Sequence, residues 1–180
     1  MNERYFILQD QHLMFKRTKD SQQVCSPMHI KYAKLVVIEE VHGNSDHDSK
    51  YCIKIVFKNK YSTLYAKSLV DQVRWSMSLT KHMTRIDFHL RFEIVAPIGS
   101  GTFAQVYKIR EKATGLCFAA KGFSKENLNK MPRGVEGLWN EISILRNLRS
   151  ENNVLKIHEV HETMNSVYVV TELLEGGTLN

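Results

Sequence analysis

The stretch that decides the fold of this chain runs from residue 98 to residue 106 and reads Ile98-Gly99-Ser100-Gly101-Thr102-Phe103-Ala104-Gln105-Val106. Two glycines one residue apart let a backbone turn tightly and approach a ligand without a Cβ in the way. Exposed backbone N–H groups in such a loop suit phosphate oxygens. The spacing alone is ambiguous, because it is also close to the glycine fingerprint that binds dinucleotides in doubly wound folds.

The residues after the loop separate these two interpretations. A dinucleotide-binding loop must open a helix whose N-terminus meets the pyrophosphate. Here residues 106–110 alternate in the manner of a strand, residues 113–115 form a turn, and Cys117 to Lys121 make a second short apolar strand. We therefore predict that the glycine loop is a hairpin flap between two strands.

Lys121 follows small and apolar residues, so its ammonium group is expected to point into a partly desolvated space that needs an anion. The alternative is a lysine that extends from the strand end into water. A helix is predicted over Glu136 to Leu148, and its apolar stripe consists of Leu138, Ile142, Leu145 and Leu148. Glu141 lies on or beside this stripe, where an unpaired buried carboxylate costs about 3–5 kcal/mol. We predict that Glu141 pairs with Lys121, and a solvated glutamate at the edge of the stripe remains the alternative.

Four segments in this order resemble the small lobe of a eukaryotic-type protein kinase: residues 98–106, 119–121, 140–142 and 167–177. The resemblance covers residues 92–180 and implies a five-stranded antiparallel sheet with one helix, which the family calls αC. It also implies ATP as a ligand, with the flap covering its phosphates, the strand lysine contacting the α- and β-phosphates, and the helix glutamate holding that lysine.

Carried over position by position, the resemblance assigns catalytic roles to Lys121 and Glu141. The residues expected to bind ATP are Ile98, Gly99, Ser100, Gly101, Thr102, Phe103, Ala104, Val106, Ala119, Lys121, Thr171, Glu172 and Leu174. Among them, Val106 and Ala119 match residues that pack on adenine, and Thr171 stands near the gatekeeper position. Glu172 and Leu174 match hinge positions whose backbone groups face adenine.

Two features depart from the family pattern. Ala104 replaces the third glycine of the loop, and the sequence contains neither a His-Arg-Asp loop nor an Asp-Phe-Gly motif. The nearest string, residues 87–89, lies before the glycine loop and cannot serve as the metal-binding motif. We therefore expect the proton-accepting aspartate and the Mg²⁺ ligands beyond residue 180, and no phosphotransferase turnover from these 180 residues alone.

Residues 1–67 predict short antiparallel strands divided by polar turns, forming a sheet or partial barrel. Strands are expected at 4–8, 13–17, 30–40, 53–57 and 61–66. A helix is predicted over 68–83, with Ser68 as its cap and with Trp75, Leu79 and Met83 along one face. Residues 84–91 are interpreted as a linker. The predicted fold class is thus α+β, with domains at 1–83 and 92–180.

The first 83 residues resemble a pleckstrin-homology domain that lacks its first strand. The resemblance rests on Arg4 to Leu8, on residues 13–15, and on Trp75 in the closing helix. It implies a regulatory or targeting module, with Arg4, Lys16 and Arg17 as candidate lipid-binding residues. A packing or protein-interaction module is the alternative.

Charge and cysteine content limit the partners. The net charge of +6 lies in residues 1–85, which hold 14 basic and 8 acidic residues, whereas residues 86–180 hold 11 of each. An anionic lipid or a protein partner is therefore expected at the first domain, and solvated lysines are the simpler interpretation. Three scattered cysteines fit free thiols in a reducing, cytoplasmic environment. No nucleic-acid partner is expected.

Two functions remain open from the sequence. The first is the ATP-binding part of a protein kinase, more in keeping with serine/threonine than tyrosine specificity, that acts on protein substrates. The second is a catalytically inactive scaffold or adaptor with a remnant nucleotide site.

Overall fold

The computed structural model describes residues 3–9, 11–25, 27–31, 33–41, 50–57 and 60–176, and the chain divides into two compact units, Met1–Thr84 and Arg85–Asn180. Residues 42–49 and 58–59, in the turns expected between the predicted strands at 30–40, 53–57 and 61–66, lie outside the described residues. Both units combine antiparallel sheets with helices, so the chain is mixed α+β. None of the described helices is both long and apolar enough to cross a lipid bilayer.

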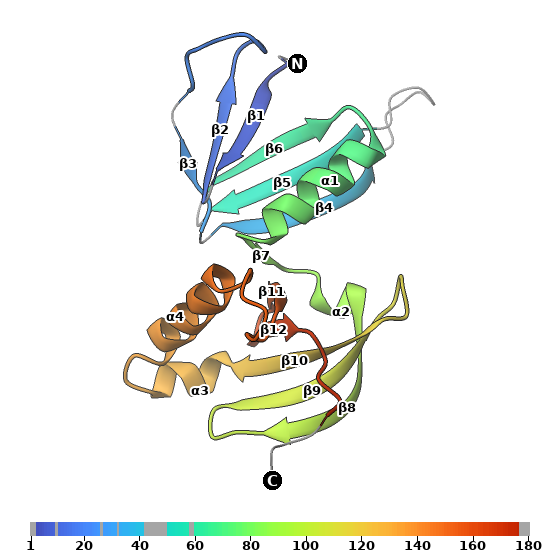
Figure 1. Cartoon of the computed structure of the whole chain (residues 1–180), viewed down its shortest axis with the longest axis vertical. Helices are drawn as coiled ribbons and strands as arrows, with labels where there is room; N and C mark the ends of the chain where they lie inside the picture. Colours follow the sequence, from blue (N-terminus) through green and yellow to red (C-terminus); the bar gives the residue numbers. More distant parts are fainter. Residues whose placement is uncertain are drawn as a thin grey trace. The chain divides into compact units, whose positions relative to one another are not determined.

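The first unit consists of two small sheets and one helix (Figure 1). One sheet contains β1 (Tyr5–Gln9), β2 (His12–Lys16) and β3 (Met28–His29) in that order, and the other contains β4 (Lys34–Val41), β5 (Lys50–Phe57) and β6 (Lys60–Ala66). The helix α1 (Leu69–Thr80) follows β6. Ser68 caps this helix as predicted, because its hydroxyl accepts the N–H of Asp71 at 3.1 Å.

The core of the first unit lies between the two sheets and α1. Its fully buried members include Leu13, Ile30, Leu35, Ile55 and Leu79, which come from both sheets, from the residues between them and from the helix. Period-two alternation places every second residue of β5 on this side, so the strand pattern read from the sequence is what builds the core.

Two boundaries in the first unit differ from the predictions. The strand expected at 30–40 begins only at Lys34, because the N–H of Ala33 turns back to the carbonyl of Ile30 at 3.0 Å. The helix expected to reach Met83 ends at Thr80, although Met83 itself is fully buried. Trp75 is only half-buried and packs at the edge of the core.

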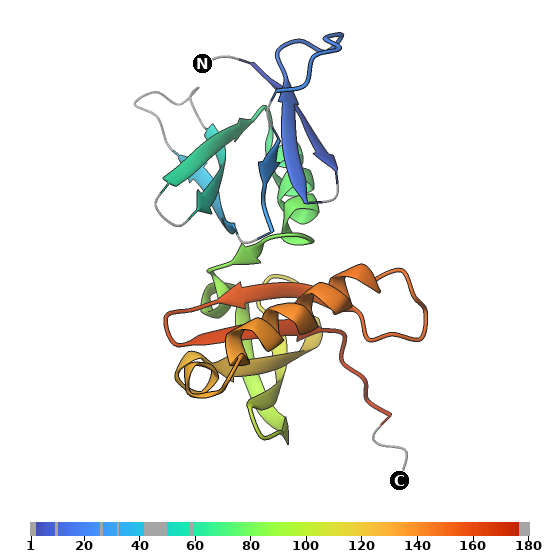
Figure 2. The ribbon, with the colours of Figure 1, turned by 90° about the vertical axis from the view of Figure 1, so that its left-hand side faces the viewer.

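The second unit contains an antiparallel sheet in the order β11-β12-β10-β9-β8, which agrees with the five-stranded sheet expected from the sequence. The strands are β8 (Phe92–Ser100), β9 (Ala104–Glu111), β10 (Cys117–Ser124), β11 (Ile157–Glu162) and β12 (Ser166–Thr171). The helices α3 (Lys125–Lys130) and α4 (Gly134–Asn147) lie between β10 and β11, and Figure 2 shows α4 crossing the face of the sheet.

Residues 84–91, which the sequence pattern suggested were a linker, hold the short strand β7 (Thr84–Arg85) and the helix α2 (Phe88–Arg91). Arg85 of β7 pairs in parallel with His161 of β11. Phe88 is fully buried and its ring stacks on that of Tyr168, with the centroids 3.9 Å apart. Burial of this aromatic ring gives the segment a fixed place in the second unit.

Candidate functional site

The glycine loop is a hairpin flap, as predicted. It joins β8 to β9, and the N–H of Gly101 donates to the carbonyl of Ala104 at 2.9 Å to close the turn. The side chain of Gln105 donates to the carbonyl of Gly99 at 2.8 Å and braces the strand before the turn. Residues 98–103 are exposed.

The flap glycines are not required by the packing of the chain itself. A Cβ on Gly99 would lie 3.7 Å from the Cβ of Val106, which is an ordinary contact, and the one added to Gly101 would lie 3.7 Å from the carbonyl oxygen of Ala104. Among the described glycines, only Gly115 has a left-handed φ. The absent side chains therefore leave open space beside the flap, which is what a close-fitting ligand needs.

The strand register gathers the predicted residues on one face of the sheet. Gly99 pairs with Val106, Val106 with Lys121, and Lys121 with Val169. In the next row Ala119 pairs with Thr171. Directly opposed residues of an antiparallel ladder point to the same side. The flap thus lies beside the strand that carries Lys121.

Lys121 and Glu141 form the predicted ion pair, with Nζ 2.8 Å from Oε1. The ammonium group also lies 4.9 Å from the centroid of the Phe123 ring. The two side chains are 41% and 39% exposed, so the pair is half-solvated. Its contribution to stability is then about 0–1 kcal/mol, and an accessible cation remains at the surface.

The helix α4 positions Glu141 because its apolar stripe packs on the sheet. Leu138 and Ile142 are buried against residues of β10, β11 and β12, and Leu145 packs beside them. Leu148 was also predicted to lie on this apolar face, but it caps the end of the helix and is 38% exposed.

Ala104, which stands where the third loop glycine was expected, packs against the same cluster. The strand expected to end at Lys121 continues to Ser124.

In the segment after β12, one of the two backbone N–H groups expected to face a ligand is already hydrogen-bonded. Thr171 is buried and its hydroxyl donates to the carbonyl of Glu172 at 3.2 Å. The N–H of Glu172 donates to the carbonyl of Lys156 at 3.1 Å, so this group, expected to face a ligand, is already used. The N–H of Leu174 makes no hydrogen bond to any residue that the structure describes. Gly177 lies outside those residues.

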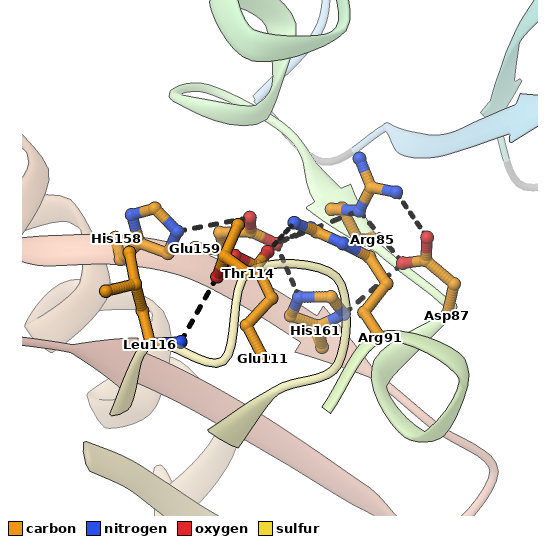
Figure 3. Close-up of polar contacts among 9 residues, drawn as sticks. All are labelled: Arg85, Asp87, Arg91, Glu111, Thr114, Leu116, His158, Glu159 and His161. Carbon is orange, nitrogen blue, oxygen red and sulfur yellow. Dashed lines mark hydrogen bonds and ion pairs between the residues drawn. The ribbon is translucent and has the colours of Figure 1, made fainter. Parts of the chain in front are cut away.

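A buried polar network behind this face was missed by the sequence reasoning (Figure 3). Glu159 of β11 accepts hydrogen bonds from Arg91 and from Nε2 of His161, the latter at 2.7 Å. Arg91 also donates to Glu111 at 2.6 Å, and Arg85 donates to Asp87. Because Arg91 reaches partners 20 and 68 positions away in sequence, no local pattern indicates the whole network.

Burial and pairing oppose each other in this network. Burial raises the pKa of Glu159, but the hydrogen bonds from His161 and Arg91 outweigh it and bring the pKa down to about 2. Burial lowers the pKa of His161 even though Glu159 and Asp87 favour its charged form. Burial also raises the pKa of Asp87, which the Arg85 guanidinium more than offsets, so the pKa is lowered overall. The network therefore pairs the ionised carboxylates of Glu159 and Asp87 with arginines, next to a neutral imidazole.

The candidate lipid-binding residues of the first unit share one end of a hairpin. Lys16 pairs with Tyr5, so Lys16 and Arg17 at the end of β2 lie beside the start of β1, which Arg4 precedes. The Arg4 guanidinium lies 5.7 Å from the centroid of the Phe15 ring. In the described parts of the chain, no group of three or more His, Cys, Asp or Glu side chains could hold a metal ion.

Comparison with known proteins shows what the second unit is similar to. Residues 92–180 match the family model of the protein kinase domain. The death-associated protein kinase dapk-1 of Caenorhabditis elegans is 36% identical over 104 residues, or 57% of this chain and 7% of that protein. Human death-associated protein kinase 2 is 42% identical over 90 residues, 49% of this chain and 24% of that protein. Calcium-dependent protein kinase 7 of Arabidopsis thaliana is 30% identical over 126 residues, 68% of this chain and 23% of that protein.

These matches support a eukaryotic-type protein kinase. The chain spans between 7% and 24% of the length of these three relatives. The antiparallel sheet, the flap and the helix α4 are consistent with the small lobe of that family.

Proposed function

We propose that the second unit binds ATP and is the nucleotide-binding lobe of a protein kinase. Backbone groups of the flap, at residues 98–104, would hold the phosphates, and Lys121 would contact the α- and β-phosphates. Glu141 would hold Lys121 in place. Val106 and Ala119 would pack on adenine from the sheet, with Thr171 at the back and the carbonyl of Glu172 and the backbone of Leu174 at the edge.

One observation carries this proposal: a lysine already engaged by a carboxylate stands beside an open glycine flap. Lys121 is one strand away from the Gly99–Val106 pair and keeps 41% of its side chain accessible. Glu141 accepts one hydrogen bond from the ammonium group, whose other two N–H groups can reach anionic oxygens. Open backbone amides and one oriented cation fit a polyphosphate.

The test is calorimetric titration of ATP into the chain and into Lys121→Met. A hydrogen bond to a charged group contributes about 1.5–3 kcal/mol, so the substitution should weaken ATP binding roughly tenfold to a hundredfold. Lys130→Met is the matched control, because Lys130 forms an exposed ion pair with Glu126 on α3, outside the proposed site. Equal ATP affinity of Lys121→Met and the unaltered chain would remove the basis of the proposal.

In the whole protein, we propose that the γ-phosphate of ATP passes to serine or threonine hydroxyls of protein substrates. The relatives named protein kinases and the resemblance of residues 172–177 to a kinase hinge support this. Mg²⁺ would neutralise phosphate charge. These 180 residues are proposed to bind ATP without transferring phosphate, because they contain neither catalytic-loop nor metal-binding motif.

For the first unit we propose a pleckstrin-homology-like module that regulates or targets the kinase. Two small sheets and a closing helix around one core support it. Arg4, Lys16 and Arg17 would bind anionic lipid, with about 1 kcal/mol from each basic residue near a membrane. Sedimentation with vesicles that contain or lack a phosphoinositide tests this. Changing these three residues to Gln should abolish binding, whereas the same change at Lys60, Arg74 and Lys81 should not. Equal losses of vesicle binding in the two triple variants would mean that binding depends on net charge and not on these three positions.

A further inference from the structure

Residues 85–91, called the strap from here on, pack on the second unit although they lie outside the family match, which begins at residue 92. Phe88 is the only fully buried apolar side chain of the strap, all of which the structure describes, whereas Ile86 and Leu90 are 46% and 80% exposed. The strap is therefore held by one apolar side chain and by charged groups. A short segment with so few apolar contacts can open separately from the core of a fold.

The charged contacts of the strap converge on β11 (Figure 3). Arg91 donates to Glu159 of β11 and, at 2.6 Å, to Glu111 at the end of β9. Arg85 donates to Asp87 within the strap at 2.9 Å, and its Nε lies 3.8 Å from Oε2 of Glu159. The carboxylates of Asp87 and Glu159 are thus each already paired with an arginine.

His161 lies in the middle of these contacts and is fully buried. Its Nε2 is 2.7 Å from Glu159, whereas its Nδ1, 3.4 Å from Oδ1 of Asp87, makes no hydrogen bond to any residue that the structure describes. The rings of Phe88 and Phe92 stand roughly perpendicular to the imidazole, each with its centroid 5.5 Å away. This enclosure fits a neutral imidazole, because the neighbouring carboxylates are already neutralised by arginines.

We propose that the strap is an acid-released tether: when His161 takes up a proton, residues 85–91 detach from β11 and become free chain between the two units. While the strap is docked, Thr84 belongs to the first unit and Arg85 to the second, so a single peptide bond of about 3.8 Å between Cα atoms joins them. Release of residues 85–91 adds a reach of up to about 23–25 Å, at 3.3–3.6 Å per residue. Protonation thereby changes how far the first unit can move from the second.

The direction of the effect follows from the surroundings of the ring in the two states. While the strap is docked, burial lowers the pKa of His161 more than Glu159 and Asp87 raise it, and Arg85 lowers it further. Once the strap has left, the ring faces water and regains its ordinary pKa of 6.5. Protons therefore bind the released state more tightly, and acid favours release. Glu159, with a pKa of about 2, and Asp87, whose pKa is also lowered, stay ionised between pH 5.5 and 7.5.

The test is amide hydrogen exchange in the full chain, followed by NMR at pH 7.5 and 5.5 and corrected for intrinsic exchange rates. The N–H groups of Leu90 and Arg91, which donate to the carbonyl of Asp87 at 3.1 Å, report on the strap, and those of β12 report on the sheet. The strap amides should be less protected than the β12 amides at both pH values. Their protection should fall by up to about tenfold at pH 5.5, which is the ratio given by one proton that binds the released state alone with a pKa of 6.5.

Three variants connect this response to one imidazole. His161→Gln should leave the protection of the strap nearly independent of pH in this range. His89→Gln is the matched control, because His89 is an exposed histidine of the strap itself, and it should keep the full response. His158→Gln should keep it as well, since His158 is 40% exposed and faces Glu159, at 3.4 Å, rather than the strap.

The proposal is overturned if the strap and β12 amides are equally protected, if the protection of the strap does not fall at pH 5.5, or if His161→Gln retains the fall. Loss of the response in His89→Gln or His158→Gln would also overturn it, because the proton would then be bound elsewhere. If His161→Gln does not fold, the unaltered chain and these two controls still decide. None of the readouts involves ATP, so the result is independent of the proposed function.

Discussion

Replacing Glu159 by Gln tests whether the buried network stabilises the second unit through charge. The Glu159 side chain is only 6% exposed and accepts from both Arg91 and His161. Glutamine keeps the shape and hydrogen-bonding capacity of a protonated carboxyl group but cannot ionise. The variant therefore isolates the contribution of the negative charge.

The magnitude follows from the pKa. Glu159 has a pKa of about 2 in the folded chain, compared with its ordinary value of 4.5. At 1.36 kcal/mol for each pH unit, the ionised form favours the folded state by about 3 kcal/mol. Because the folded pKa is the lower one, this stabilisation is complete above about pH 4.5 and is lost as the pH falls towards 2. Glu159→Gln should thus unfold more easily by about 3 kcal/mol at pH 7.

The assay is urea unfolding followed by the fluorescence of Trp139. Each unit holds one tryptophan, so a Trp75→Phe background leaves a reporter in the second unit alone. Glu136→Gln is the control, since Glu136 pairs with Arg133 at 2.7 Å on the exposed surface, where solvent screening leaves an ion pair little effect on stability. The reasoning is refuted if Glu159→Gln and Glu136→Gln lose equal stability at pH 7, or if the loss in Glu159→Gln persists at pH 2.

Four further predictions concern single residues. Burial lowers the pKa of His161, so the unfolding free energy should fall as the pH drops below about 6.5, and His161→Gln should remove this part of the pH profile measured by urea titration. Gly122→Ala should destabilise the second unit by about 1–3 kcal/mol, because its Cβ would meet the rings of Tyr168 and Tyr107. Gly99→Ala should unfold like the unaltered chain but bind ATP more weakly; unchanged ATP affinity would count against phosphate contact at that position. Ser68→Ala should cost the first unit about 0.5–2 kcal/mol by loss of the α1 cap, and thermal unfolding followed by Trp75 should detect it.

The sequence was enough for features that depend on local order. Alternation after Gly101 identified the flap as a hairpin, because a strand pattern of period two cannot be mistaken for a helix over several residues. Helical spacing placed Glu141 beside an apolar stripe, and the cost of an unpaired carboxylate pointed to Lys121. The spacing of residues alone therefore predicts the main ion pair of the candidate site.

The polar network and the close approach of two tyrosine rings to Gly122 could be recognised only in the tertiary structure. Glu159 acquires its low pKa from Arg91, which is 68 positions away in sequence, and Gly122 matters because Tyr107 and Tyr168 arrive on neighbouring strands. The exposed fractions of the Lys121 and Glu141 side chains could likewise not be predicted from the sequence, since periodicity indicates which side of a helix a residue lies on but not how deeply it is covered. Secondary structure follows from the spacing of residue types along the chain, whereas burial and charge pairing depend on which distant segments the fold brings together.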